Sequence, residues 1–384
     1  MMAAAQFFCL WSAVFVSPLF EEQARSPSRD FIVIVREGQG CNAASIPVLD
    51  HPFPMQRLDS ECQVAIVQAS TLKEARLARP VRVEKEPKAL ASIQLTEEEG
   101  AVRIDRDGML LTRYCFAGVP RPFLYPLIGP SGLGVTRNFP MGEEEGEEKD
   151  HPHHRSLWFS FGSVNGVDFW AEDDKSGRIE HVSFTDKVTG PVFAALSTEN
   201  RWVAPDGTVV CSDVRTVRVY GVREDVVLDF DLTLRASHGE LTLGDTKEGM
   251  FAVRVAETMR VKGPVAKGHL VNSKGLRDGA AWGKRAQWCD YVGPVGEDTI
   301  GVAIFDHPGN FRHPTYWHVR DYGLFAVNPF GLHDFENRHD EPHLGDHVVP
   351  EGESLTFRYR VLVHRGDTVE AKVADQYEAY ASVE

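Results

Sequence analysis

The region from residue 92 to residue 363 holds a long succession of short segments with the features of β-strands, and no helical pattern separates them. Several alternate polar and apolar residues, as in RTVRVY at 215–220 and TFRYRV at 356–361, which is typical of antiparallel strands with one solvated face. Because parallel strands need crossover helices, this region predicts an all-β fold, a large antiparallel β-sandwich of the supersandwich type. The segments expected as strands are residues 92–95, 101–104, 110–116, 157–161, 179–184, 192–200, 209–220, 226–234, 251–259, 299–305 and 354–363.

The two ends of the chain follow other patterns. Two apolar, β-branched segments at 31–35 and 62–67 predict strands of a small β domain over residues 30–95, and KEPK at 85–88 is typical of a linker. One helix is expected near the C-terminus, over residues 368–381 with Asp367 as its N-cap. The sandwich domain with this C-terminal helix therefore covers residues 96–384.

Residues 1–20 form an apolar stretch that several polar residues and a proline interrupt, and no Lys or Arg precedes its core. This predicts a signal-like or disordered segment over residues 1–29 and leaves cytoplasmic and exported locations both open. No later stretch approaches the ~20 apolar residues that a spanning helix needs, so no membrane span is expected.

Composition narrows the possible partners. The net charge is −15, from 56 acidic and 41 basic residues, so the chain would repel the phosphates of nucleic acid. Hydrophobic residues make up 42% of the chain, enough for a real core. The six cysteines are scattered singly, which does not suggest a zinc ribbon or a disulfide framework. A small molecule or an oligosaccharide is the expected partner.

The segment DHPHHR at 150–155 places three imidazoles and a guanidinium within six residues, directly before an apolar segment expected as a strand. Imidazole titrates near neutral pH and can move protons or bind a metal ion. The acidic run GEEEGEEK at 142–149 precedes this cluster, and it is either a solvated loop or a lid.

A second cluster, FDHPGNFRHPTYWHVR at 305–320, combines histidines, arginines and aromatic rings. Its two His-Pro pairs predict a rigid loop in the middle of the segment. Rings that stack on sugar faces, next to guanidinium groups that bind carboxylates at two points, suit a sugar or a uronic acid. Three further segments supply candidates: GDTKEG at 244–249, NGVDFW at 165–170, where Asn-Gly predicts a hairpin turn, and VNPFG at 327–331.

The chain resembles the bacterial family labelled methane oxygenase PmoA. The resemblance is carried by the motifs at 150–155, 165–170, 244–249, 305–320 and 328–331, together with Arg254. The resemblance covers roughly residues 98–380, and Phe311 stands where proline is expected. It implies a sandwich similar to that of galactose mutarotase-like proteins and a place among the carbohydrate-associated proteins of polysaccharide-degrading bacteria. Methane oxidation is rejected, because the enzyme subunit with that activity spans the membrane and this chain has no segment that could.

Three functions remain open on these residues. The first is acid-base catalysis on a sugar or uronic acid by an epimerase, lyase or hydrolase, and the second is sugar binding without catalysis. The third is a metal-dependent enzyme with one divalent ion, Cu or Zn. The candidate catalytic residues are His154, Glu248, Lys247 and His313. The candidate substrate-binding residues are Arg155, Trp170, Asp245, Arg254, His307, Arg312, Tyr316, Trp317, His318, Arg320 and Asn328. The candidate metal ligands are His151 and His153, or His154, together with a residue of the 307–318 loop.

Overall fold

The computed structural model describes residues 30–36, 55–57, 62–68 and 90–381. The chain divides into two compact units, of which one comprises Leu90–Tyr377. In the other unit, β1 (Asp30–Arg36), β3 (Cys62–Gln68) and β2 (Met55–Arg57) form an antiparallel sheet in the order β1-β3-β2. Strands β1 and β3 lie where the sequence predicts them. The expected segment at residues 1–29 lies outside the described residues.

The larger unit is the predicted antiparallel sandwich. Within the described residues it consists of two eight-stranded sheets, here called sheet I and sheet II, and a short pair formed by β13 (Leu241–Leu243) and β20 (His347–Val349). In sheet order, sheet I contains β18 (Tyr316–Val319), β19 (Leu324–Asn328), β14 (Gly249–Arg254), β8 (Leu157–Phe161), β7 (Phe123–Leu124), β6 (Met109–Cys115), β5 (Ala101–Arg106) and β4 (Ile93–Glu98). Sheet II contains β15 (His269–Asn272), β16 (Trp288–Val295), β17 (Asp298–Asp306), β21 (Ser354–Arg365), β12 (Val226–Arg235), β11 (Val209–Tyr220), β10 (Phe193–Val203) and β9 (Arg178–Thr189).

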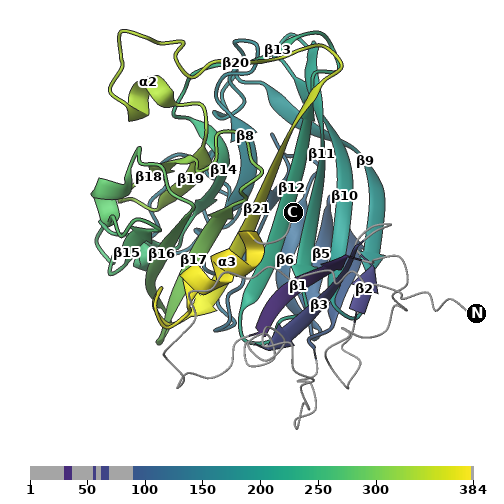
Figure 1. The fold of residues 1–384 in the computed structure, drawn as a ribbon, viewed down its shortest axis with the longest axis vertical. Helices are drawn as coiled ribbons and strands as arrows, with labels where there is room; N and C mark the ends of the chain where they lie inside the picture. Colours follow the sequence, from purple (N-terminus) through teal and green to yellow (C-terminus); the bar gives the residue numbers. More distant parts are fainter. Residues whose placement is uncertain (1–29, 37–54, 58–61, 69–89, 382–384) are drawn as a thin grey trace, which may run out of the picture. The chain divides into compact units, whose positions relative to one another are not determined.

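Side chains from the facing surfaces of the two sheets build the core. Phe251 of β14 stacks on Tyr359 of β21 with ring centroids 5.0 Å apart, and Phe159 of β8 lies 6.2 Å from Phe230 of β12. Each fully buried aromatic ring of this kind contributes about 1.5–3 kcal/mol to folding by leaving water. Figure 1 shows the long strands β9 to β12 side by side in sheet II.

The register of sheet I determines which residues share its outer face, the face turned away from sheet II. Because side chains alternate along a strand, Ala252 points to the face opposite that of Phe251. Ala252 is paired with Trp158 on one side and with Ala326 on the other, and Ala326 is paired with His318. Trp158 is in turn paired with Phe123. One row across the outer face therefore runs from His318 to Phe123.

The structure differs from the sequence prediction in several elements. The expected strand 251–259 ends at Arg254 and is followed by the 3₁₀ turn η1 (Glu257–Met259). Strands β15, β16 and β19 lie in segments with no predicted strand, and β18 lies at the end of the 305–320 segment, whose middle was expected to be a rigid loop. Two other short elements are η2 (Asp278–Ala281) and α2 (Leu332–Phe335). The expected hairpin at Asn165 and Gly166 is confirmed, since both have positive φ and Val164 bridges Val167.

The C-terminal helix begins later than predicted. Asp367 does cap a turn, because its carboxylate accepts hydrogen bonds from the backbone N–H groups of Val369 and Glu370. Lys372 then adopts a left-handed conformation with φ 52°, which interrupts the helical hydrogen bonding, and α3 spans Val373–Ala381. Tyr377 packs edge-on against Phe305 of β17, with centroids 5.7 Å apart. In the part of the chain that the structure describes, no helix is long and apolar enough to cross a membrane.

Candidate functional site

An aromatic and apolar cluster covers the middle of the outer face of sheet I. Trp158, Ala252 and Ala326 form it together with Trp170 from the loop after β8, and Tyr322 packs against it. The indole N–H groups of Trp158 and Trp170 are buried, and neither has a hydrogen-bond partner among the described residues. A buried donor without a partner costs about 1–3 kcal/mol, so these two groups are a cost to folding within the cluster.

His318 lies at the end of the same row and is 3% exposed. Burial, with smaller effects from the charges of Arg320 and Lys247, lowers the pKa of His318 to about 3. The imidazole is therefore neutral at physiological pH. Its Nδ1 is buried and has no hydrogen-bond partner in the described part of the chain.

Asp150 joins three positively polarised groups at one edge of the cluster. Its Oδ1 accepts hydrogen bonds from Arg137 and, at 2.7 Å, from Arg254, and its Oδ2 accepts one from Nδ1 of His151 at 2.6 Å. Burial opposes ionisation of this carboxyl, but the hydrogen bond from His151 and the charges of Arg254 and Arg137 outweigh it and hold its pKa well below the usual range. Asp150 is thus an anion that orients His151.

His151 presents its imidazole to solvent beside two parallel rings. Its ring lies 4.8 Å from that of His154 at 8° and 5.0 Å from that of Tyr322 at 11°. Because an ionised carboxylate can only accept, the bond to Asp150 places a proton on Nδ1 of His151. Nε2 of this exposed side chain is then left to exchange a proton with a ligand.

His154, by contrast, is buried under the cluster. Arg254, which can only donate, approaches Nδ1 of His154 to 3.1 Å, and the His154 ring stacks on Trp158 at 5.4 Å. Burial lowers the pKa of His154 well below its ordinary value, and burial with the charge of Arg121 lowers that of His153 to about 4. His154 therefore acts as a neutral packing and hydrogen-bonding group, which makes His151 the better proton donor of the segment.

Glu248 lies in the turn before β14, close to groups from two other segments. Burial raises its pKa; Asp168 raises it further, whereas Lys247, His151 and Arg320 lower it. The Nζ atom of Lys247 lies 3.8 Å from Glu248 and 3.5 Å from Asp334. The segments 150–155, 244–249 and 316–322 therefore meet in one electrostatic neighbourhood.

Arg320 and Arg254 flank the ring of Tyr322. Their guanidinium carbons lie 5.7 Å and 4.7 Å from its centroid, within the range of a cation–π interaction. Burial lowers the pKa of Arg254 to about 10, which leaves it charged, and its second partner is Asp150. Arg320 is exposed, and no described carboxylate pairs with its guanidinium. Arg320 is consequently the cation of this site that is available to an anionic ligand.

The structure brings other candidates into supporting roles. Arg155 binds Glu172 through two parallel hydrogen bonds, of 2.8 Å from Nε and 2.7 Å from Nη2, and its guanidinium lies over Phe123. The buried Arg121 donates to the carbonyls of Trp170 and Ala171 and pairs with Glu172 at 3.3 Å. These contacts hold the loop that carries Trp170 against the cluster.

Residues of the 305–320 segment are divided between the core and the loop network. Trp317 faces sheet II, is fully buried and donates its indole N–H to the carbonyl of Ala286, so it offers no ring face for a ligand. Tyr316 donates its hydroxyl to Glu336, and burial together with this bond raises its pKa to about 12. His313 is held by the buried Asp306 at 2.7 Å, inside the loop.

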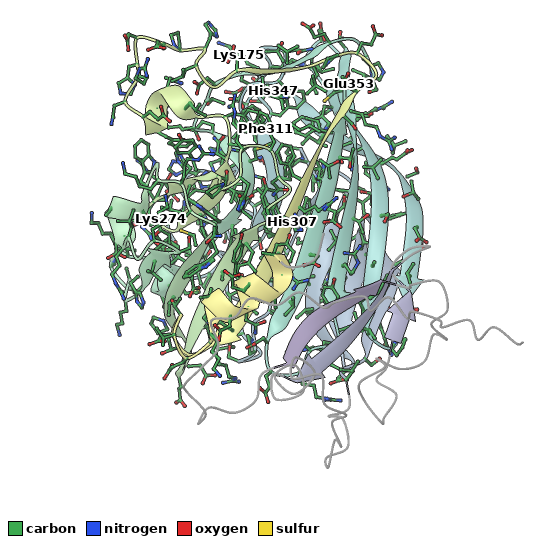
Figure 2. The ribbon with its side chains drawn as sticks, viewed as in Figure 1. Lys175, Lys274, His307, Phe311, His347 and Glu353 are labelled. Atoms are coloured by element: carbon green, nitrogen blue, oxygen red, sulfur yellow. The ribbon has the colours of Figure 1, made fainter. Side chains whose placement is uncertain are left out.

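Four other candidates stabilise turns. Arg312 donates to the carbonyls of Pro329 and Gly345, and the ring of the neighbouring Phe311 lies 4.3 Å from that of His347, a pair labelled in Figure 2. His307 is 7% exposed, and its Nδ1 accepts from the backbone of Gly309. Asn328 donates to the carbonyl of Thr246, and the buried carboxylate of Asp245 accepts from the backbone of His333 and Gly345. These polar groups are engaged inside the protein.

His151 and His154 cannot bind one divalent ion together. The rings of His151 and His154 are parallel, so their in-plane lone pairs run side by side and cannot converge on one ion. Arg254 and Arg137 place further positive charge beside them. Within the described residues, no group of three or more His, Cys, Asp or Glu side chains is placed to hold a metal ion.

We therefore expect protein purified without chelator or affinity metal to contain far less than one metal ion per chain by elemental analysis. Dialysis against excess Zn²⁺, followed by removal of free ion, serves as a loading control. A stoichiometric metal that is lost in His151→Ala would contradict this result and would make the cluster a ligand set.

Several site residues escaped the sequence analysis, chiefly Tyr322, Trp158 and Asp168. Tyr322 follows the second cluster by two residues, and Trp158 follows the first by three. The alternation of side chains along β8 could have identified Trp158, because it places Trp158 on the outer face of the sheet and Phe159 on the inner face. Asp168 stood in a quoted motif, but its effect on Glu248 depends on the fold.

The protein is therefore a two-sheet antiparallel sandwich with an aromatic and ionisable site on the outer face of one sheet. The chain belongs to DUF6807, a family of unknown function, whose model matches residues 101–378. The methane oxygenase name that the motifs suggest is not part of that description. No similar protein was found among the curated proteins.

Solved structures with similar folds are distant. An α-galactosidase from Lactobacillus brevis matches with a TM-score of 0.34 and 9% identity, over 72% of this chain and 40% of that one. A glycoside hydrolase family 97 enzyme from Pseudoalteromonas sp. strain K8, in complex with acarbose, matches with a TM-score of 0.31 and 9% identity, over 74% and 36%. A galactose mutarotase-like protein from Clostridium acetobutylicum matches with a TM-score of 0.34 and 9% identity, over 73% and 100%. The chain thus spans about two fifths of the length of the first two.

Proposed function

We propose that this protein is an enzyme that binds a sugar or uronic acid on the outer face of sheet I and transfers a proton on it. Glu248 is the base, and His151, oriented by Asp150, is the acid. Acid-base chemistry needs two titratable groups that reach the same substrate with different proton affinities. The two residues come from segments about a hundred positions apart in the chain.

The observation that carries the proposal is the environment of Glu248. Burial makes its carboxylate a stronger base than an ordinary glutamate, while His151 and Arg320 lie near enough for their charges to act on it. A strained or purely structural carboxylate would be expected to pair with a buried cation, as Asp150 does with Arg254. Glu248 instead has Lys247 as its nearest cation, at 3.8 Å and 40% exposed.

The surroundings suit a sugar. The exposed imidazole of His151 and the exposed guanidinium of Arg320 are polar groups that the hydroxyls of a sugar can reach. The ring of Tyr322 holds the stacked imidazole of His151 and the guanidinium of Arg320 close to each other. Arg320 would bind a carboxylate through two parallel hydrogen bonds.

In the proposed step, the carboxylate of Glu248 takes a proton from a carbon or hydroxyl of the bound sugar. His151 gives its Nε2 proton to the oxygen on which negative charge develops, and Asp150 holds the ring in place through its bond to Nδ1. Proton exchange with solvent restores both groups. The bond that breaks in the sugar depends on the substrate.

The test is a panel of neutral hexoses, pentoses and hexuronates, followed by nuclear magnetic resonance for conversion and for exchange of protons with deuterated solvent. We expect turnover of one member and a loss of activity as the pH falls through the pKa of Glu248. That acidic limb lies above the ordinary value of 4.5 because burial raises this pKa. If some sugars of the panel bind but neither conversion nor proton exchange with solvent is observed, the protein binds sugar without catalysis and the proposal is wrong.

Arg320→Ala should weaken the binding of a hexuronate by about tenfold, because a charge-assisted bidentate contact is lost. Binding of the corresponding neutral sugar should change by less than about twofold. Isothermal titration calorimetry measures both. Arg235→Ala removes an exposed arginine of sheet II and is the matched control. An equal loss for the neutral sugar would show that Arg320 acts on folding and not on the carboxylate.

A further inference from the structure

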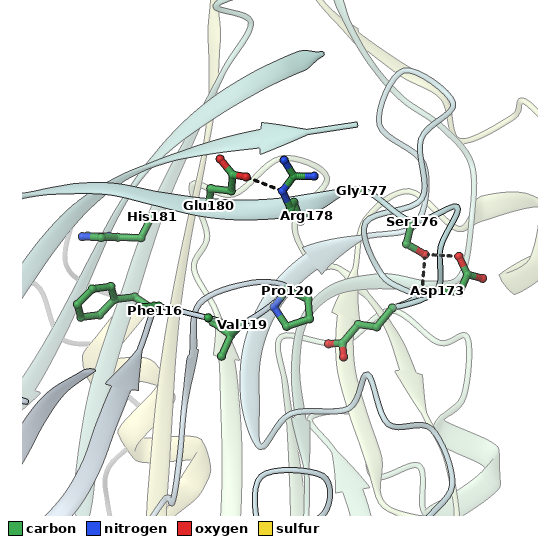
Figure 3. A pocket seen from close by; sticks show the side chains of 12 residues that line it. Phe116, Val119, Pro120, Asp173, Ser176, Gly177, Arg178, Glu180 and His181 are labelled. Atoms are coloured by element: carbon green, nitrogen blue, oxygen red, sulfur yellow. Dashed lines mark hydrogen bonds and ion pairs between the residues drawn. The ribbon is translucent and has the colours of Figure 1, made fainter. Parts of the chain in front are cut away.

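A hollow of about 730 Å³ lies beside the site, between the end of β6 and the start of β9. Its walls come from the β6–β7 connection, residues 116–120, and from residues 172–181. A hydrogen bond from the backbone N–H of Ile179 to the carbonyl of Pro120 joins the two walls. Figure 3 shows Phe116 and His181 at one end of the hollow and Asp173 and Ser176 at the other.

The first end of the hollow is aromatic. The ring of Phe116 lies 4.5 Å from that of His181, and Phe184 lies 4.5 Å from His181 and 5.1 Å from Phe116. Phe116 and His181 are only half-buried, although they belong to strands or strand ends of a well-packed sandwich. Rings held by such neighbours give a ligand a rigid apolar surface at little cost in conformational entropy.

Part of the remaining lining is polar, and these polar groups are already oriented. Glu180 accepts hydrogen bonds from Arg178 and Arg201, and Asp173 accepts one from the hydroxyl of Ser176 at 2.9 Å. Carboxylate and guanidinium groups in fixed positions, next to a ring, match a saccharide, whose hydroxyls lie around an apolar ring face.

Two residues connect the hollow with the site at Glu248. Val119 lines the hollow and packs against the cluster that contains Trp158 and Trp170. Glu172 lines it too and binds Arg155 of the histidine segment. Asp168, whose charge acts on Glu248, is four residues from Glu172 in the chain, a separation of at most about 14 Å. One short segment therefore connects the wall of the hollow at Glu172 to the surroundings of Glu248.

We propose that the hollow is a second saccharide-binding site, which holds a further unit of the sugar chain bound at Glu248. The preferred ligand of the protein is then an oligosaccharide. This inference rests on the proposed function for the identity of the first site. It makes a separate claim, which is that affinity depends on the length of the sugar chain and that Phe116 is responsible for this dependence.

The test is calorimetric titration with xylo-, cello-, galacto- and galacturono-oligosaccharides of one to six units. For the series that binds, we expect affinity to rise by about tenfold or more from the monosaccharide to the longer members, as the second contact becomes intramolecular. Phe116→Ala should abolish this gain and leave monosaccharide affinity within about twofold. Met109→Ala, at the other end of β6 and 69% exposed, is the control.

Arg178→Ala is the second variant, because truncating Phe116 also removes its contacts with His181 and Phe184, whereas Arg178 is a surface side chain. Loss of the gain in both variants, with unchanged melting temperature in Arg178→Ala, supports the inference. Affinity that does not change with chain length overturns it, even where Glu248→Gln abolishes turnover and the proposed function stands. If affinity depends on chain length through Phe116 but turnover survives Glu248→Gln, the result supports the hollow as a binding site and rejects Glu248 as the base. Absence of binding in every series overturns both.

Discussion

Glu248→Gln is expected to lower kcat by about 10²–10⁴-fold while the dissociation constant of the substrate stays within about threefold. The amide keeps the size and hydrogen-bonding shape of the carboxyl but cannot take a proton. The loss corresponds to about 3–5 kcal/mol of transition-state stabilisation. Steady-state kinetics give kcat, and calorimetry under non-turnover conditions gives the dissociation constant.

The pH profile separates a catalytic role of Glu248 from a structural one. In the parent protein, activity falls on the acidic side as Glu248 gains its proton, at a pH above the ordinary range because burial raises its pKa. The residual activity of Glu248→Gln should lack that limb. Glu353→Gln, an exposed glutamate before β21, is the matched control and should behave as the parent. An unchanged acidic limb in Glu248→Gln would assign the proton transfer to another group.

Asp150→Asn is expected to destabilise the fold by about 3 kcal/mol at pH 7. The side chains of Arg137 and Arg254 are 0% exposed, and both donate to Asp150. Removing one partner of a buried ion pair costs about 3–5 kcal/mol, and the lower end applies because Asp150 remains 31% exposed. Chemical denaturation of the parent and the variant at one temperature measures the difference in the free energy of unfolding.

The effect of Asp150 should depend on pH in a defined direction. Its pKa is lower in the folded state than its ordinary 3.8, so its contribution is present above about pH 4 and is lost as the pH falls further. The difference between Asp150→Asn and the parent should therefore shrink below that pH. Glu143→Gln, which removes the exposed pair with Lys149 in the same acidic run, is the control and should leave stability unchanged. A difference that persists at low pH would show that the asparagine harms packing and not charge pairing.

The two histidine-rich motifs show what a sequence reading could and could not resolve. The sequence shows three imidazoles within four residues, but it does not show that His154 is buried while His151 is exposed. That distinction comes from Trp158, Arg254 and Tyr322, which pack around the segment. In the second motif, no strand was predicted at β18, so the alternation that sends Trp317 into the core and His318 to the outer face was missed.

The antiparallel sandwich was determined by the sequence itself, because period-two alternation and turn residues are local properties that each segment carries independently. The C-terminal helix was also predictable in kind, although the left-handed Lys372 shifted its start. Only the tertiary structure decided which ionisable groups meet. The pairing of β8, β14, β19 and β18 brings together side chains that are up to about 170 residues apart in the chain, and burial there changes their proton affinities. Proximity and desolvation are properties of the packed sheet and not of any one segment.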